Sequence, residues 1–187
     1  GEKVASETGG LALHLDLSDE GSIDKAVAQI LAEEFPLAGI VLAASPPPTI
    51  LPLFKIPESD FADQWHINVD GPRKLLADII RKSMRPNKQG WIVGILSQAM
   101  GSPDLAAKNM GSYIIAKYGL LGLLKTLETE YSWLNVISVK PGYTETKMLD
   151  VYDDRFLDQL REKEPIDRFS LPEEIAQEII MRIPETK

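Results

Sequence analysis

Tyr113 and Lys117 lie four residues apart in the stretch "NMGSYIIAKYGLLGLLKTLETEYS" (109–132), whose apolar spacing predicts a helix. Residues four apart share one face of a helix. An ordinary tyrosine has a pKa of about 10, too high for a base at neutral pH, but a fixed cation beside it lowers that pKa. The pair therefore indicates a general acid–base group. The alternative is a tyrosine at a helix edge beside a lysine that extends into water.

Other polar or turn-forming residues fall where strands are expected to end. Ser97 closes one buried strand, Asn68 lies on the helix before that strand, and Pro141-Gly142 follow the next strand. The carboxyl ends of parallel strands meet at one edge of a sheet, where α/β proteins bind ligands. The Ser97 hydroxyl is therefore placed to hydrogen-bond a substrate oxygen.

The elements that must position these residues follow from apolar periodicity. Short apolar runs predict strands at 11–17, 38–44, 90–97 and 135–140, and helical spacing predicts helices at 22–35, 58–84, 112–130, 150–164 and 172–182. Ser22 is the expected N-cap of the first helix, and Gly71-Pro72 should break or bend the second. Strand–helix alternation predicts an α/β fold with a doubly wound parallel sheet, Rossmann-like, in a single domain spanning 1–187.

Composition excludes several classes of protein. The 187 residues include no cysteine, so disulfides and thiolate metal sites are excluded, and this fits a cytoplasmic location. The net charge of −8, with no basic cluster, argues against nucleic acid and anionic membranes as partners. His14 and His66 match no metal-ligand spacing, so no metal site is predicted.

Six motifs in order resemble the short-chain dehydrogenase/reductase family, and the pattern is most similar to its 3-oxoacyl-carrier-protein reductase members. They are "LHLDLSD", "HINVDG", "WIVGILS", "SYIIAK", "VKPGYTET" and "RFSLPEEIAQEI", which together cover about residues 11–180. The resemblance implies an NAD- or NADP-dependent oxidoreductase that interconverts a secondary alcohol and a ketone.

The resemblance also implies roles for individual residues. Tyr113 would exchange a proton with the substrate oxygen, and Lys117 would lower its pKa and hold the nicotinamide ribose. Ser97 would orient the carbonyl, and Asn68 would hold a water that links Lys117 to solvent. The implied cofactor-binding residues are Asp16, Leu17, Ala43, Ala44, Ser45, Tyr113, Lys117, Pro141, Gly142, Thr144 and Thr146.

The chain departs from the family pattern in four respects. No TGxxxGxG turn is found, so the sheet is expected to be incomplete at its N-terminal strands, and the chain stops before the family's last strand. "LAAS" (42–45) stands where the family has Asn-Asn-Ala-Gly. Ser97 lies 16 positions before Tyr113, so Ser102 competes with it as the catalytic serine. The residue that selects NAD or NADP lies outside the sequence, so the cofactor is either one.

Two readings of function remain. The first is the enzyme; the second is a related domain without redox activity that serves regulation or assembly, which the missing Gly-rich turn favours. A metal-dependent hydrolase lacks ligands. Apolar residues on the helices at 72–84 and 112–130 favour a homodimer or homotetramer.

The segment 144–166 resembles the family's mobile lid over a small-molecule substrate. The residues Met148, Leu149, Tyr152, Phe156 and Leu160 have helical spacing and are expected to roof an apolar pocket, whereas four aspartates lie on the other face. We therefore expect a carbonyl substrate with a hydrophobic body rather than a strongly anionic one.

Overall fold

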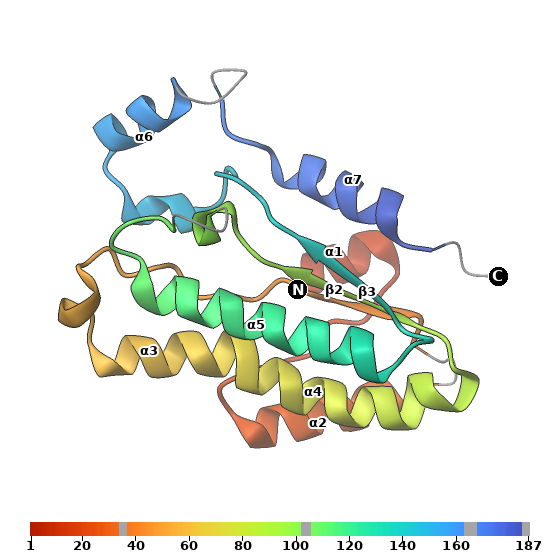
Figure 1. Ribbon diagram of the computed structural model, residues 1–187. Helices are drawn as coiled ribbons and strands as arrows, with labels where there is room; N and C mark the ends of the chain where they lie inside the picture. Colours follow the sequence, from red (N-terminus) through yellow and green to blue (C-terminus); the bar gives the residue numbers. More distant parts are fainter. Residues whose placement is uncertain (34–36, 102–105, 163–167, 185–187) are drawn as a thin grey trace.

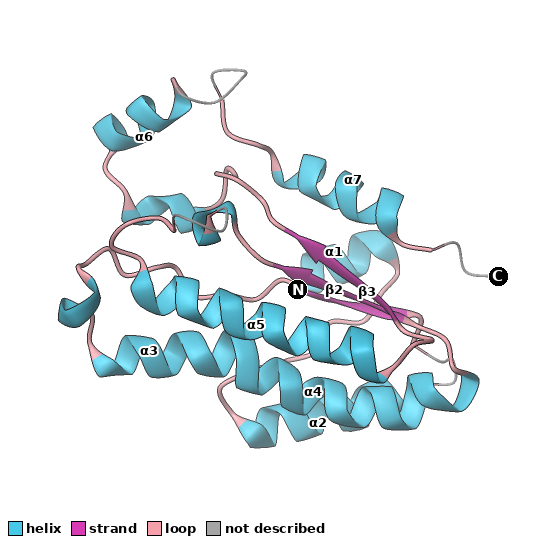
Figure 2. Cartoon of the chain, viewed as in Figure 1, coloured by secondary structure: helices cyan, strands magenta, loops and turns pink. Residues whose placement is uncertain are grey.

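A three-stranded parallel sheet forms the centre of the computed structural model, which describes residues 1–33, 37–101, 106–162 and 168–184. Its strands are β1 (Gly39–Leu42), β2 (Trp91–Ile95) and β3 (Asn135–Val139), in the order β1-β2-β3. Val41 pairs with Val93, and Val93 with Ile137. Three of the four predicted strands are thus confirmed (Figure 2).

Helices cover both faces of this sheet. One face carries α2 (Glu20–Ala32), α3 (Glu58–Trp65), α4 (Gly71–Ile79) and α5 (Gly111–Glu130), and the other carries α7 (Pro172–Arg182) (Figure 1). The helix α6 (Asp154–Arg161) lies beyond the carboxyl ends of the strands, and α1 (Glu2–Thr8) has no buried residue. The parallel strands and two-sided covering confirm the doubly wound α/β class.

Alternation along β2 divides the core into two layers. Ile92 packs in the cluster that includes α2, α4 and α5, whereas its neighbour Val93 packs with Ile137 of β3 and Ile179 of α7. Successive strand residues point to opposite faces, so one strand serves both layers. Because both faces are covered, β2 is apolar throughout, as predicted for a buried parallel strand.

The strand predicted at 11–17 is wrong. Residues 11–16 have no regular secondary structure, and no strand lies beside them among the described residues, whereas a β-strand needs a partner for its backbone groups. Instead, Asp16 Oδ1 accepts hydrogen bonds from the backbone nitrogen and hydroxyl of Ser18, which makes a local turn. The N-cap of α2 is Asp19 and not the predicted Ser22. The Oγ of Ser22 instead accepts a hydrogen bond from the Asp16 backbone nitrogen at 2.9 Å.

The predicted helix 58–84 passes Gly71-Pro72 without a break. A π-helical segment, His66–Asp70, joins α3 to α4, and a second one, Ile80–Met84, follows α4. A π-turn shifts the hydrogen-bond pattern by one residue, which accommodates a proline that has no donor. Gly71 serves close packing, since a Cβ there would lie 2.3 Å from the carbonyl oxygen of Leu17.

The tail follows the prediction in part. The helix expected at 172–182 is α7, whereas the one expected at 150–164 is divided into a 3-10 turn, Lys147–Val151, and α6. Asp153 Oδ1 accepts from the backbone nitrogen of Phe156 and caps α6. Positions 163 and 164 lie outside the described residues.

The apolar residues on which the oligomer prediction rested are mostly covered by the chain itself. Leu75, Leu76, Ile79 and Ile80 of the 72–84 stretch are buried, as are Ile114, Leu120, Leu124 and Leu127 of α5. Each of these side chains packs inside one chain, so they offer no surface to a second copy. Ile115 remains exposed.

Candidate active site

A cavity of about 640 Å³ opens at the carboxyl ends of β1 and β2. Its described lining includes nine of the predicted site residues: Ala43, Ser45, Ser97, Tyr113, Lys117, Pro141, Gly142, Thr144 and Thr146. They come from the ends of all three strands and from α5. The structure therefore brings together most of the residues that the sequence singled out.

The end of β2 fixes Ser97. The parallel pairing continues past the strand, because Leu96 N donates to Val139 O at 2.8 Å and Gln98 N donates to Pro141 O at 2.9 Å. Ser97 Oγ accepts from the backbone nitrogen of Ala99 at 3.1 Å, which caps a 3-10 turn, and its side chain also hydrogen-bonds the Tyr113 side chain. The serine is thus held beside the phenol.

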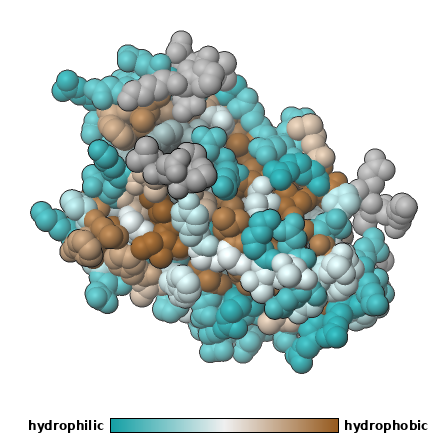
Figure 3. Space-filling view, in the orientation of Figure 1, coloured by the Kyte–Doolittle hydropathy of each residue, from teal (hydrophilic) through white to brown (hydrophobic). Residues whose placement is uncertain are grey.

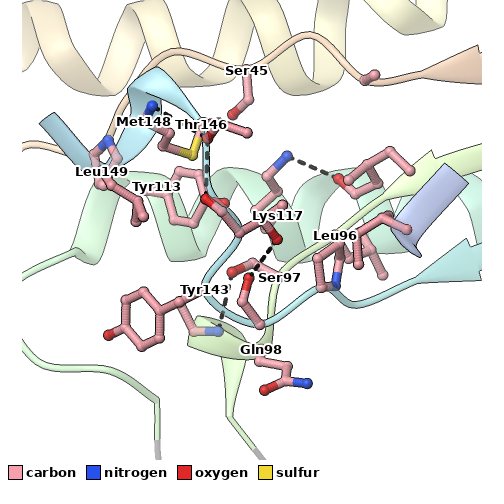
Figure 4. A pocket seen from close by; sticks show the side chains of 18 of the residues that line it. Ser45, Leu96, Ser97, Gln98, Tyr113, Lys117, Tyr143, Thr146, Met148 and Leu149 are labelled. Carbon is pink, nitrogen blue, oxygen red and sulfur yellow. Dashed lines mark hydrogen bonds between the residues drawn. The ribbon is translucent and has the colours of Figure 1, made fainter. Parts of the chain in front are cut away.

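The helix α5 places Tyr113 and Lys117 on one inward face, as predicted. They are 5% and 2% exposed, so the alternative of a lysine extending into water is wrong. Lys117 Nζ donates to the carbonyl oxygen of Ile95 at 2.9 Å and lies 5.5 Å from the centroid of the Tyr113 ring (Figure 4). The ammonium is therefore anchored to β2 and beside the aromatic ring.

Burial dominates the protonation of both groups. It raises the pKa of Tyr113 above its ordinary value, an effect that the hydrogen bond with Ser97 opposes. Burial lowers the pKa of Lys117 from 10.5 to about 8. The sequence predicts a tyrosine pKa lowered by the cation, but the pKa of Tyr113 is raised, so at neutral pH Tyr113 carries its proton and is a donor.

Other predicted residues lie elsewhere. Asn68 is 1% exposed and lines a second, apolar groove of about 290 Å³ beside β1, together with Leu17 and Ala44. Asp16 is exposed in its local turn, where the hydrogen bonds from Ser18 lower the pKa of its carboxyl. Neither Asp16 nor Asn68 lines the cavity. Ser102, the competing serine, lies outside the described residues.

The roof of the cavity is apolar and aromatic. Met148, Leu149 and Tyr152 line it as predicted, whereas Phe156 is 40% exposed and stacks on Tyr152 with ring centroids 5.3 Å apart. Burial and the neighbouring Tyr143 raise the pKa of Tyr152 to about 12. Among the described lining residues, Leu160 is absent.

Three features of the lining were not predicted. Tyr143 follows Pro141-Gly142 directly and faces the cavity, and Met110 precedes α5. The Ile95 carbonyl that holds Lys117 was missed as well. Tyr143 could have been predicted from its position directly after Pro141-Gly142. Backbone acceptors and loop residues such as Met110, in contrast, cannot be recognised from a sequence pattern.

The described residues include no group of three or more His, Asp or Glu that could hold a metal ion. Within the same part of the chain, no helix is both long enough and apolar enough to cross a bilayer. Lys117 is the one charged side chain among the described cavity-lining residues. The site is therefore a mainly apolar pocket whose described lining carries one ammonium, three phenols, the Gln98 amide and the hydroxyls of two serines and two threonines.

The family model described as enoyl-(acyl carrier protein) reductase matches residues 1–181. The chain belongs to the short-chain dehydrogenase/reductase family. A solved short-chain dehydrogenase/reductase family protein superimposes with a TM-score of 0.83 at 26% identity, covering 98% of this chain and 74% of that one.

Among curated members of this short-chain dehydrogenase/reductase family, two 3-oxoacyl-[acyl-carrier-protein] reductases are similar. The Aquifex aeolicus protein is 29% identical over 123 residues, which is 65% of this chain and 48% of that protein. The Mycobacterium bovis protein is 25% identical over 170 residues, which is 90% of this chain and 67% of that protein. The chain thus spans about half to two thirds of these relatives.

Proposed function

We propose that this chain carries the catalytic half of an NAD(P)-dependent oxidoreductase that interconverts a secondary alcohol and a ketone. The supporting observation is the joint placement of Ser97, Tyr113 and Lys117 at one cavity. Two of these groups, the phenol and the ammonium, have buried side chains with pKa values moved by burial, as is common at functional sites.

The cavity fits a nicotinamide cofactor. Lys117 uses one of its three donors on Ile95 O, and the described part of the lining includes no carboxylate that would repel phosphate or neutralise the ammonium. Lys117 would hold the ribose hydroxyls, with Ala43, Ser45, Pro141, Gly142, Thr144 and Thr146 around the rest of the cofactor. When bound, the cofactor supplies or accepts the hydride.

Three side chains of this chain then serve the substrate. Tyr113, protonated at neutral pH, donates its proton to the carbonyl oxygen during reduction and recovers it from the alcohol in the reverse direction. Ser97 orients the carbonyl and stabilises charge on its oxygen. The Lys117 ammonium favours the phenolate that remains after proton transfer.

The substitution Tyr113→Phe tests this function, since it keeps the ring and removes the proton donor. We expect turnover to fall by about two to four decades, with the far-ultraviolet circular dichroism unchanged. Cofactor affinity, measured by nicotinamide fluorescence, should stay near that of the wild type. Tyr118→Phe is the matched control on the same helix, because Tyr118 lies outside the described cavity lining and its hydroxyl contacts the backbone, donating to Met100 O at 3.1 Å. Full activity of Tyr113→Phe would overturn the mechanism.

The lining also favours a particular substrate class. Met110, Met148, Leu149 and the aromatic ring of Tyr152 offer apolar contacts to the body of a ketone. We expect ketones with neutral hydrophobic tails to show higher kcat/KM than matched ketones with anionic tails. The reverse order across such a panel would contradict the proposal.

The non-redox alternative predicts something different: no cofactor binding at any concentration, with the fold intact. We also propose a homodimer or homotetramer in the cytoplasm, which now rests on Ile115 from the first prediction and on two further exposed residues. Trp65, Ile115 and Tyr118 are 46%, 47% and 47% exposed on α3 and α5. Light scattering at micromolar concentration checks this, and a monomeric mass would contradict it.

A further inference from the structure

Three side chains form a polar stripe on α3 and the π-helical segment that follows it. Asp60, Gln64 and Asn68 are spaced by four residues, so they share one face of α3 and the π-helical segment after it. Gln64 and Asn68 are each 1% exposed. Buried amides at these positions need partners, and the partners show what the stripe does.

Gln64 joins Asn68 to the proline-rich loop after β1. Its Nε2 donates to Pro47 O at 3.0 Å and to Pro46 O at 3.5 Å, and its Oε1 accepts from Asn68 Nδ2 at 3.1 Å. Pro46 O also accepts from the hydroxyl of Ser45, which lines the cavity. A chain of hydrogen bonds thus runs from the cavity wall to Asn68.

The run Pro46-Pro47-Pro48 fixes which group donates and which accepts in this series of hydrogen bonds. A carboxamide orients according to its partners, and these three residues have carbonyl groups but no backbone N–H. Gln64 must therefore present its NH₂ group to the loop and its oxygen to Asn68. Asn68 must then donate to Gln64, which it does to Gln64 O at 3.0 Å as well as to Gln64 Oε1.

One atom is left over. Asn68 Oδ1 is buried and has no hydrogen-bond partner among the described residues. The π-helical segment that carries it packs against α5, the helix of Tyr113 and Lys117, and a Cβ at Gly119 of α5 would lie 2.8 Å from Val69 Cγ2. A buried acceptor without a partner is costly unless it has a role.

We propose that Gln64 is a positioning residue, which together with the triple-proline loop holds the Asn68 amide so that its oxygen is presented to the interior beside α5. This inference rests on the proposed function for its kinetic consequences, because the family resemblance implies that Asn68 holds a water that links Lys117 to solvent. The carbonyl groups of the prolines orient the Gln64 amide, and the Gln64 amide orients that of Asn68. The Asn68 oxygen is thereby left available as a hydrogen-bond acceptor. Gln64 itself does not line the cavity.

Gln64→Met tests the proposal kinetically, because methionine keeps the length and apolar packing but removes both ends of the relay. We expect kcat to fall by roughly ten- to a hundredfold, the scale of a misplaced catalytic group, with KM nearly unchanged. Asn68→Ala should have a similar effect, and the double variant should be no worse than Asn68→Ala alone. Asp63→Asn, on an exposed neighbour in α3, is the matched control and should match the wild type.

Two results would overturn the proposal: effects that multiply in the double variant, or a Gln64→Met variant with a lower Tm but wild-type kcat. An inactive wild type would count against the proposed function rather than this inference, so a second readout is independent of activity. In nitrogen-15 NMR spectra, the side-chain NH₂ of Asn68 should exchange slowly with solvent in the wild type and faster in Gln64→Met. Equal exchange in the two proteins would show that Gln64 does not hold the amide.

Discussion

The cavity and the apolar groove lie beside the same strand, β1, yet they differ in what fixes the residues around them. The cavity is lined by β2, α5 and the segment after β3, and its polar groups are tied by hydrogen bonds to Ile95, Ala99 and Pro141. The groove is bounded on one side by the unpaired segment 15–17. Ala43 lines both.

This difference teaches where site geometry comes from. Side chains on the cavity side hold their positions through contacts within this chain, so they match the expected arrangement. Asp16 and Leu17, on the groove side, were assigned to a strand that finds no partner among the described residues. The hydropathy map gives the surface context, with apolar and polar residues interspersed over one face of the molecule (Figure 3). Predictions can separate the two regions.

The largest effect on stability should come from the hydrophobic core that includes α5. Leu124 is 1% exposed and fills the space above Gly94, where a Cβ would lie 2.4 Å from Leu124 Cδ1. We expect Leu124→Ala to lower the free energy of unfolding by about 2–5 kcal/mol. Val41→Ala, on the 42% exposed side chain of β1, should cost less than about 1 kcal/mol. Urea unfolding of both variants measures the contrast, and equal losses would mean that Val41 is as tightly packed as Leu124.

A smaller effect concerns the buried ammonium. The folded pKa of Lys117 is about 8, below its ordinary 10.5, so the unfolded chain binds more protons between these values. Stability of the wild type should therefore rise as pH increases from about 8 to 10.5, and Lys117→Met should lack this rise. At pH 7 the variant should be more stable by on the order of 2 kcal/mol, while binding cofactor more weakly.

Lys125→Met is the control for that variant, because Lys125 lies on the same helix with a 66% exposed side chain. It should keep the wild-type dependence of unfolding on pH. If Lys117→Met binds cofactor as tightly as the wild type, Lys117 does not contact the ribose.

The smallest effect should come from the surface pair that holds the start of α7. Glu174 accepts from Arg168 and from the backbone nitrogen of Leu171, and Arg168 lowers the pKa of Glu174 to about 2. Its contribution is present above the ordinary carboxylate pKa of 4.5 and is lost as pH falls toward 2. Glu174→Gln should lower Tm slightly at pH 7 and not at all near pH 2. A difference that persists at pH 2 would exclude this ion pair as its cause.

The sequence was a good guide wherever a local pattern decides the structure. Apolar periodicity placed β1, β2, β3 and α5, and the spacing of Tyr113 and Lys117 put them on one inward face. It failed where the outcome depends on distant partners: segment 11–17 is apolar enough for a strand but has no neighbour to pair with. The same holds for the pKa of Tyr113, since the degree of burial is set by the whole fold. The Gln64–Asn68 relay depends on loop carbonyls, which no side-chain pattern reveals.

The buried ammonium of Lys117 has a consequence for how the cavity exchanges protons. With a pKa of about 8, part of the lysine population is neutral in mildly alkaline buffer. Any ligand that places an acceptor or a negative group beside Lys117 favours the charged form, so its binding draws a proton from solution. The measured heat of binding should then change with the ionisation enthalpy of the buffer, and a calorimeter would detect the lysine without any chemical turnover.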